Sequence, residues 1–303
     1  MPDMELPTRL TSEPPPVADA VISFPTPYIL QLTLNRPKAL NAFQRAQHFA
    51  LHRLWGWYDA QPSLRCAIIT GTGRAFSAGA DLKEWEAISQ SRGVSVPPLD
   101  GAASHTNNVF SDDEASGALL PPGGFGGISN RDGKKPILAA VNGICFGGGM
   151  EIAINCDMVI AADSATFGLP EVTVGVIALA GSLTRIVRSV GRQRATEMVL
   201  SGKSYSAEEM RAWGLVNEIV DGDGEAVLQR TLMWAERIAA NSPDAVIASR
   251  EGLKLAWEGV GPQEGTASII ENWYSRIDKG DNMMEGMKSF IEKRKPVWKD
   301  SDL

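Results

Sequence analysis

The 303-residue sequence has little cysteine and no long apolar run. Its three cysteines, Cys66, Cys145 and Cys156, form no Cys-x-x-Cys pair, so we expect buried thiols in a reducing compartment rather than disulfides or a zinc site. No apolar stretch approaches the roughly 20 residues that span a bilayer, so no membrane association is expected. The chain has 36 acidic and 29 Lys and Arg residues, and the resulting net charge of −7 argues against general nucleic-acid binding.

Neither end of the chain carries a familiar targeting signal. Residues 1–20 are rich in proline and lack the residue order of a secretory signal, so we expect a flexible extension. The last three residues, Ser301-Asp302-Leu303, match a Ser-Lys-Leu peroxisomal signal poorly. The sequence therefore favours a cytoplasmic location and leaves peroxisomal import open.

Several common site motifs are also missing. The glycine-rich stretches 71–73 and 147–149 do not complete Gly-x-Gly-x-x-Gly, and Gly202-Lys203-Ser204 lacks the first glycine of a phosphate-binding loop. No Gly-x-Ser-x-Gly elbow of a serine hydrolase is present. His48 and His52 lie four residues apart on a predicted helix without an evident carboxylate partner, so we expect packing rather than metal binding.

The alternation of short apolar strands with helices predicts an α/β core with mostly parallel strands. A helix from Asn41, its expected N-cap, to about Asp59 follows the first strand. A further helix is expected at Gly148–Asn155. Strands are expected at Tyr28–Leu34, Arg65–Thr70, Ile137–Val141 and Met158–Ala161.

Helical spacing dominates after residue 195, and only Val216–Val220 is typical of a strand. We divide the chain into an extension (1–20), a core (21–240) and a C-terminal helical region (241–303) that packs on the core or on neighbouring subunits. Residues 89–132, rich in Gly, Pro, Ser and Asp, predict a mobile surface insertion, either covering a substrate entrance or inert. Helices are expected at Ala195–Leu200, Ala207–Trp213, Glu225–Ala240, Asp244–Trp257, Gln263–Lys279 and Glu285–Lys293.

The strongest chemical signal lies in residues 139–157. A buried strand runs into three glycines, 147–149, and the following helix has Glu151 in its first turn. The first N–H groups of a helix have no acceptor within it, and the helix dipole adds positive potential there. Glycine lets a ligand approach closely because it has no Cβ. A bare N–H beside a carboxylate suits a site that stabilises a developing oxyanion.

A second segment and a second carboxylate complete this pattern. Residues 77–80 are small and precede a helix, so a backbone N–H there can also face a ligand. Glu171 follows Glu151 by 20 residues, and a returning strand can bring it to the same pocket. Alone, a glutamate after proline is more typical of a solvated turn. Glu151 stands among apolar residues, where an unpaired carboxylate is costly, and this favours a functional role.

These motifs together resemble the enoyl-CoA hydratase/isomerase, or crotonase, superfamily. The resemblance rests on Ala-Val-Asn-Gly-x-x-x-Gly-Gly-Gly-x-Glu at 140–151 and Phe-Gly-x-Pro-Glu at 167–171, and it covers roughly residues 24–299 apart from the insertion. It implies an α/β spiral of repeated β-β-α units with a C-terminal helical oligomerisation region, assembled as a homotrimer or homohexamer. It also implies an acyl-CoA thioester substrate and no separate cofactor, because coenzyme A is part of the substrate.

The resemblance assigns roles to individual residues. It implies that the N–H groups of Ala80 and Gly148 form an oxyanion hole for an enolate, and that Glu151 and Glu171 bind water and move a proton. The presence of both carboxylates favours reversible syn addition of water to a 2-enoyl-CoA, which gives a 3-hydroxyacyl-CoA. Alternatives are a Δ-isomerase, a carnitinyl-CoA dehydratase-like enzyme or a non-catalytic CoA-binding protein. The CoA contacts that it implies are Lys38, Ala39, Leu40, Ala78, Lys83, Tyr274 and Lys293.

One stretch departs from the family pattern. Residues 178–182, Ala-Leu-Ala-Gly-Ser, stand where many hydratases have a proline- and glycine-rich stretch. Leu179 replaces a glycine whose backbone helps to hold the catalytic water in relatives. We therefore expect this residue and the 89–132 insertion to shape the acyl pocket.

Overall fold

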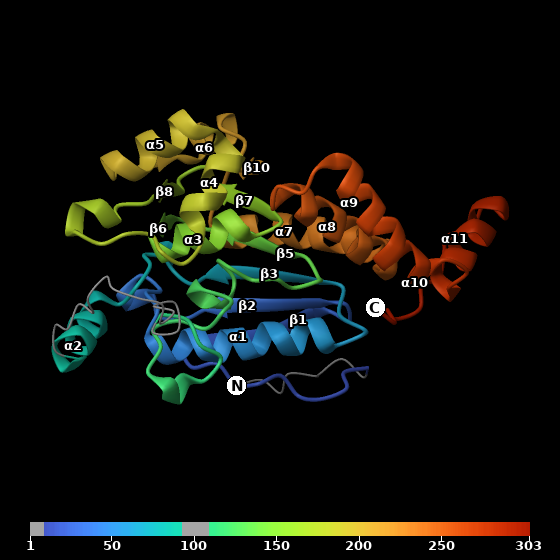
Figure 1. Ribbon diagram of the computed structural model, residues 1–303, viewed down its shortest axis with the longest axis horizontal. Helices are drawn as coiled ribbons and strands as arrows, with labels where there is room; N and C mark the ends of the chain where they lie inside the picture. The colour runs from blue at the N-terminus through green and yellow to red at the C-terminus, as the bar shows by residue number, and fades with distance from the viewer. Residues whose placement is uncertain (1–8, 93–108) are drawn as a thin grey trace.

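The computed structural model describes residues 9–92 and 109–303, and two sheets form its centre (Figure 1). The larger sheet has the order β1-β2-β3-β5-β7-β10 and the smaller one β4-β6-β8-β9. Only the β1–β2 and β8–β9 pairs are antiparallel. The strands are β1 (Ala20–Thr26), β2 (Ile29–Leu34), β3 (Cys66–Gly71), β4 (Ala75–Ser77), β5 (Ile137–Val141), β6 (Ile144–Phe146), β7 (Met158–Ala162), β8 (Thr166–Gly168), β9 (Tyr205–Ser206) and β10 (Glu218–Val220).

The chain passes from the larger to the smaller sheet three times in succession. It runs from β3 into β4, from β5 into β6 and from β7 into β8. The helix α2 (Leu82–Arg92) follows the first passage, α3 (Gly148–Asn155) the second and α4 (Ser182–Val190) the third. This arrangement confirms the expected spiral of β-β-α units.

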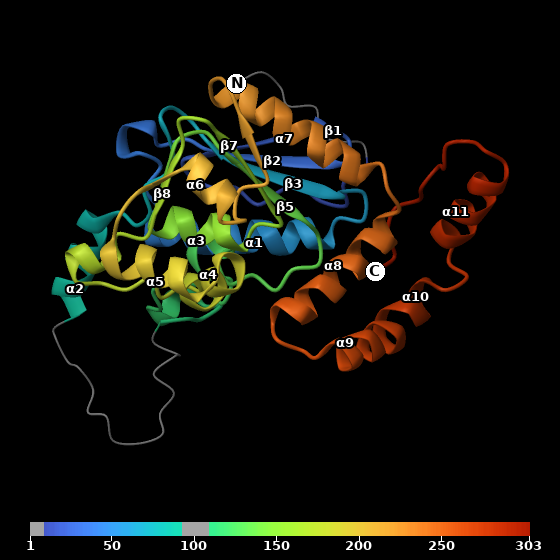
Figure 2. The same cartoon turned by 90° about the horizontal axis from the view of Figure 1, so that it is seen from above.

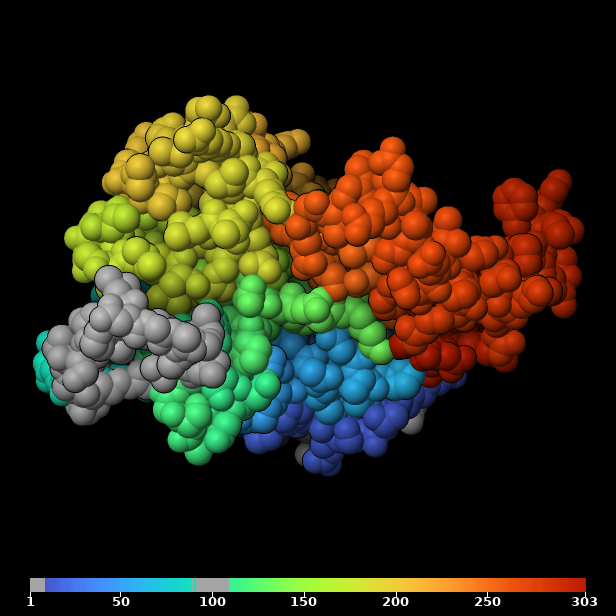
Figure 3. Space-filling model, viewed as in Figure 1, coloured from blue at the N-terminus to red at the C-terminus, as the bar shows by residue number. Residues whose placement is uncertain are grey.

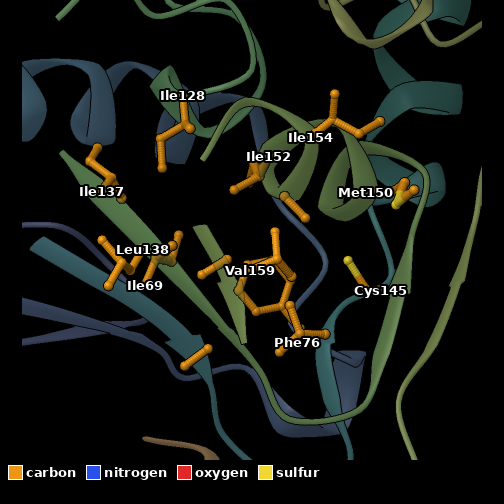
Figure 4. Close-up of a cluster of buried hydrophobic side chains, with 14 of the residues drawn as sticks. Ile69, Phe76, Ile128, Ile137, Leu138, Cys145, Met150, Ile152, Ile154 and Val159 are labelled. Carbon is orange, nitrogen blue, oxygen red and sulfur yellow. The ribbon is translucent and has the colours of Figure 1, made fainter. Parts of the chain in front are cut away.

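The central strands are apolar on both faces because helices cover the larger sheet on both sides. Every residue of β5 is buried, as are all residues of β3 except the last. Figure 2 shows α7 (Gly224–Ala239) on one face and α1 (Arg45–Ala60) with α3 on the other. Figure 4 shows side chains of α3, such as Ile152, facing Leu138 and Val159 of the strands. Such double burial gives the continuous apolar runs seen in the sequence.

The expected strands β2, β3, β5 and β7 are present, and α3 has the predicted bounds. Strand β1 and helix α4 were not expected. The prediction for α1 was wrong at its start, because Asn41 is not its cap. Asn41 has a left-handed φ of 54°, and the first N–H of α1, that of Arg45, is instead bound by the Glu84 carboxylate of α2 at 2.7 Å.

Asn41 instead holds the turn that leads into β4. Its buried amide accepts from the N–H of Arg36 and donates to the carbonyls of Thr72 and Ala75. Asn142 donates to Gly73 and to the same Ala75 carbonyl from the other side. Two side-chain amides therefore fix the backbone from which the segment 77–80 emerges.

The predicted extension packs on the core over the residues that are described. Val17 is buried, the N–H of Thr11 donates to Gln61, and Trp57 donates to Ser12. The expectation of a flexible extension is thus wrong for residues 9–19, and residues 1–8 lie outside the described residues.

The 89–132 insertion is also more ordered than predicted. Residues 93–108 lie outside the described residues, but residues 118–129 include several buried side chains and hydrogen-bond to α1 and α3. Short 3₁₀ turns occur at Glu114–Ser116 and Phe125–Gly127. The expectation of a mobile surface segment is therefore wrong for this second half.

The C-terminal region is helical, as predicted, and extends to one side of the molecule (Figure 3). The helix expected at 263–279 consists of α9, a π-helical turn at Ile270–Tyr274 and α10. Residues 298–303 return to the core, where the carbonyl of Trp298 accepts from Arg65. No described helix combines the length and apolar character that a bilayer crossing requires. The helices of the second half are α5 (Arg192–Ser201), α6 (Ala207–Ala212), α8 (Pro243–Trp257), α9 (Pro262–Ile269), α10 (Ser275–Ile277) and α11 (Asp281–Ile291).

We predict that Asn41→Ala lowers the free energy of unfolding by roughly 2–4 kcal/mol, because it leaves buried backbone groups unpaired and puts alanine in a left-handed conformation. Urea unfolding followed by circular dichroism measures this change. Asn35→Ala is the matched control, since exposed Asn35 accepts only a hydrogen bond from the Thr72 hydroxyl and should cost about 0.5 kcal/mol or less. Equal losses in the two variants would contradict the proposed role of Asn41.

Candidate active site

Three parallel strands of the smaller sheet end at one place. Strand β4 leads into residues 78–80, β6 into Gly147 and Gly148, and β8 into Pro170 and Glu171. The N–H of Gly147 donates to the carbonyl of Gly168 at 3.0 Å, which joins the ends of β6 and β8. The topology therefore gathers the sequence-predicted segments at the carboxyl edge of this sheet.

The backbone around Ala80 is oriented by an isolated bridge to Phe43. Phe43 donates its N–H to the carbonyl of Gly79, and its own carbonyl accepts from the N–H of Asp81, at 2.8 and 2.9 Å. In a parallel bridge of this kind, the N–H of the intervening residue points the other way. The N–H of Ala80 is thus directed away from Phe43, and Ala80 lines the pocket described below.

The two candidate oxyanion segments touch each other. A Cβ on Gly79, whose φ is 96°, would stand 2.9 Å from the nitrogen of Gly148, so only glycine fits there. Gly148 begins α3, and its N–H therefore has no acceptor within the helix. The structure thus brings Ala80 and Gly148 to the same pocket, as the sequence predicted.

Glu151 lies in the first turn of α3 and is only 3% exposed. Its Oε2 accepts from the N–H of Ser182, the first residue of α4, at 3.1 Å. Burial raises the pKa of Glu151 to about 7, and the nearby Glu171 carboxylate adds to the rise, while the Ser182 hydrogen bond opposes it. Glu151 therefore takes up or releases a proton near neutral pH.

Glu171 faces the same space from the 3₁₀ turn Glu171–Val174 that follows β8. Its Oε2 is buried and has no hydrogen-bond partner among the described residues. Burial raises the pKa of this carboxyl as well. Two carboxyl groups with raised pKa values that line one pocket are suited to paired acid–base chemistry.

The pocket around these groups has a volume of about 180 Å³ and mostly apolar walls. Its mouth includes the exposed side chain of Leu82, and its interior includes Leu179, the residue that departs from the family pattern. The lining residues are Ala78, Ala80, Leu82, Trp85, Leu120, Phe125, Gly147, Gly148, Glu151, Pro170, Glu171, Thr173, Val174, Val176, Ile177, Leu179 and Ala180.

Leu120 and Phe125 were missed by the sequence reasoning. Both belong to the 89–132 insertion, whose composition indicated a mobile segment rather than part of a pocket wall. Both are nearly fully buried. A sequence signal does exist, since large apolar residues are sparse in this stretch and these two lie just before and after Pro121-Pro122 and Gly123-Gly124.

The residues expected to contact CoA fall into two groups. Ala78 lines the pocket, and its N–H donates to the carbonyl of Leu40 at 2.9 Å, which places the 38–40 turn beside the pocket. Lys38 and Lys83 are exposed near this entrance, on the 3₁₀ turn Pro37–Ala39 and on α2. Tyr274 lies in the π-helical turn and Lys293 in the turn after α11, and this C-terminal region is at the opposite end of the long axis from α2 (Figures 1 and 2). One chain does not bring these two groups together.

Two backbone N–H groups beside a buried and a half-buried carboxyl group suit an enzyme that moves protons next to a carbonyl group. The sequence profile of the enoyl-CoA hydratase/isomerase family matches residues 27–98 and 129–301. The chain therefore belongs to the enoyl-CoA hydratase/isomerase family, as its motifs indicated.

Several named proteins are similar to this chain over most of its length. Mevalonyl-coenzyme A hydratase of Beauveria bassiana is 53% identical over 97% of this chain and 99% of the relative, and that of Aspergillus fumigatus is 45% identical with the same coverage. Carnitinyl-CoA dehydratase of Salmonella typhi is 34% identical over 89% and 95%. The crystal structure of enoyl-CoA hydratase from Mycobacterium tuberculosis H37Rv matches with a TM-score of 0.77 and 30% identity, covering 93% of this chain and 99% of that one.

The buried Glu151 predicts a pH-dependent stability. The pKa of Glu151 is about 7 in the folded state, whereas its ordinary value is 4.5. The contribution of Glu151 to the free energy of unfolding is therefore fully present below pH 4.5 and is lost as the pH rises to about 7. We expect the free energy of unfolding of Glu151→Gln, relative to that of the wild type, to increase by about 3 kcal/mol between pH 4.5 and pH 7.5. Thermal unfolding of both proteins across this range tests it, with exposed Glu236→Gln as control. A pH-independent difference between Glu151→Gln and wild type would contradict it.

Proposed function

We propose that this enzyme is a CoA-thioester hydro-lyase that interconverts mevalonyl-CoA and its 2-enoyl dehydration product. Two observations support the proposal. The pocket is lined by the buried Glu151 and the half-buried Glu171, beside Ala80 and Gly148 with their backbone N–H groups. The relatives that are 53% and 45% identical over nearly the whole chain are named mevalonyl-coenzyme A hydratases. The sequence alone predicted the wider class, hydration of a 2-enoyl-CoA, and the mevalonyl group narrows that class to an acyl chain with a methyl and a hydroxyl group on C3.

In the proposed reaction the thioester oxygen sits between the N–H groups of Ala80 and Gly148. Removal of a proton from C2 moves negative charge onto this oxygen, and the two N–H groups stabilise the enolate that forms. Losing one such donor typically costs about 3 kcal/mol of transition-state stabilisation. The positive end of the α3 dipole acts in the same direction.

The two glutamates account for the protons. In dehydration the ionised carboxylate takes the C2 proton, and the protonated one gives its proton to the C3 hydroxyl as the C3–O bond breaks and water leaves. Hydration reverses these transfers through the same singly protonated pair. We assign water activation to Glu151 and the C2 proton to Glu171, since members of the family that only move a double bond commonly keep the latter. The presence of Glu151 therefore supports a hydratase over an isomerase.

The CoA part of the substrate is proposed to lie over the 38–40 turn and Ala78, with Lys38 and Lys83 near its phosphates. Tyr274 and Lys293 lie too far along the chain's long axis to join this site in the same subunit (Figure 1). A role for them in CoA binding requires a neighbouring subunit, and we propose a homotrimer or a pair of trimers for this reason.

The decisive experiment follows the conjugated-thioester absorbance when purified enzyme meets mevalonyl-CoA. We expect the absorbance to rise with wild type, and expect Glu151→Gln and Glu171→Gln each to slow the reaction by about 10²–10⁴-fold because each removes one acid–base group. Glu236→Gln should react like wild type. Turnover of carnitinyl-CoA or crotonyl-CoA without turnover of mevalonyl-CoA would reject the proposed substrate, and unchanged rates in both glutamine variants would reject the mechanism.

The same pair predicts a bell-shaped dependence of kcat/KM on pH, because only the singly protonated pair reacts in either direction. The raised pKa of Glu151, about 7, places the alkaline limb close to neutral pH rather than near the ordinary range of carboxyl groups. Initial rates between pH 5 and 9 measure this. A rate that stays constant from pH 5 to 9 would show that the pair does not share a proton.

A further inference from the structure

The wall of the acyl pocket that contains Leu120 and Phe125 has an unusual origin. The family profile matches residues 27–98 and 129–301, so both residues lie in the stretch that it does not cover. Both are nevertheless buried and line the pocket with the two glutamates. The part of the pocket that differs most from the family pattern is thus supplied by this segment.

Phe125 is held directly against the catalytic backbone. Its ring lies over the Cα of Gly148, so closely that a Cβ there would overlap the ring. The ring also packs edge-on against Phe43 and His48, with centroids 5.0 and 4.3 Å away. Phe43 is the residue whose bridge orients Ala80. The position of Phe125 is therefore tied to both candidate oxyanion donors.

Hydrogen bonds from three directions fix the backbone of this wall. The N–H of Phe125 donates to the buried Ser129 hydroxyl, which donates in turn to the carbonyl of Ala180, at 2.7 and 2.6 Å. The N–H of Gly126 donates to His48 Nδ1 at 3.0 Å, and its carbonyl accepts from Trp55 Nε1 at 3.0 Å. These bonds hold the backbone of the wall in place, and the packing of the Phe125 ring against Phe43, His48 and Gly148 opposes its rotation.

His48 acts only as an acceptor and a packing surface here. Its pKa is lowered to about 3 by burial and by nearby Arg45, so it is neutral, and the hydrogen bond from Gly126 places its own proton on Nε2. The ring stacks on Phe43 with an interplanar angle of 2°. His48 thus connects α1 to the wall without touching the pocket.

We propose that Leu120 and Phe125 form a fixed wall that restricts the pocket to short acyl groups, and that His48 is a positioning residue for Phe125. The inference rests on the proposed function only in taking this pocket as the acyl site. A short acyl group branched at C3 fits beside such a wall, whereas a long straight chain needs space that the Phe125 ring fills.

Binding of substrate analogues that cannot react tests the wall separately from catalysis. Dissociation constants of isovaleryl-CoA, octanoyl-CoA and free CoA are measured by calorimetry. We expect wild type to prefer isovaleryl-CoA, and Phe125→Ala and Leu120→Ala to shift the ratio of the two acyl-CoA constants toward octanoyl-CoA by tenfold or more, since each buried methylene is worth roughly fourfold in affinity. Leu253→Ala, which shortens an exposed leucine of α8 outside this pocket, is the matched control and should shift the ratio less than twofold.

Further variants keep the result interpretable. Phe125→Leu retains a folded core and should give an intermediate shift if Phe125→Ala unfolds. His48→Leu, which removes the acceptor for Gly126, should shift the ratio in the same direction, and His48→Gln, which can keep an acceptor, should shift it less. Ratios that stay within twofold of wild type in Phe125→Leu and Leu120→Ala would overturn the proposal. Failure of the pocket assignment itself looks different, because isovaleryl-CoA would then bind no more tightly than free CoA.

Discussion

The contact between the segments 78–80 and 147–149 is the constraint on which the rest of the site depends. A side chain on Gly79 would collide with the backbone nitrogen of Gly148, and a side chain on Gly148 would collide with the Phe125 ring. The contact is possible because β4 and β6 are parallel neighbours and both end there. The amides of Asn41 and Asn142 hold the turn before β4, and the Phe43 bridge orients the residues after it. Two residues with a backbone N–H are thus held at one pocket by these neighbouring contacts.

A buried carboxyl group is the second requirement, and the fold offsets its cost locally. Glu151 stands on a mostly apolar helix, and its carboxylate accepts a hydrogen bond from the N–H of Ser182 at the N-terminus of α4. That helix begins at Ser182, the last residue of the stretch 178–182 in which this chain departs from the family pattern. In the same stretch, the carbonyl of Ala180 accepts a hydrogen bond from the Ser129 hydroxyl. Glu151 and the residues that we propose as the acyl wall therefore both contact this stretch, so substitutions at the two places are not expected to have additive effects.

Local sequence patterns predicted those parts of the structure that local physics decides. The bounds of α3 followed from its glycines and from the apolar residues after them, and the Glu151–Glu171 pair followed from its motifs. Asn41 was misassigned because a helix cap and a left-handed turn residue use the same amide, and only the tertiary contacts with Thr72 and Ala75 distinguish them. The second half of the insertion, residues 109–132, was misjudged because a composition rich in Gly, Pro, Ser and Asp was taken as a sign of mobility. Gly124, Gly126 and Gly127 all have positive φ values, so here glycine allows a tight, well-bonded loop.

The passage of the chain from the larger to the smaller sheet has a consequence for how the protein folds. The three segments of the site follow β4, β6 and β8, strands that pair in parallel across long stretches of sequence. Parallel pairings of this kind form slowly, because the entropy of closing a large loop is lost before the strand contacts stabilise the structure. Pairing of β4, β6 and β8 is what brings both N–H groups and both carboxyl groups together. Catalytic competence is therefore gained late, when the last turn of the spiral closes, and recovery of activity during refolding reports completion of the two-sheet core.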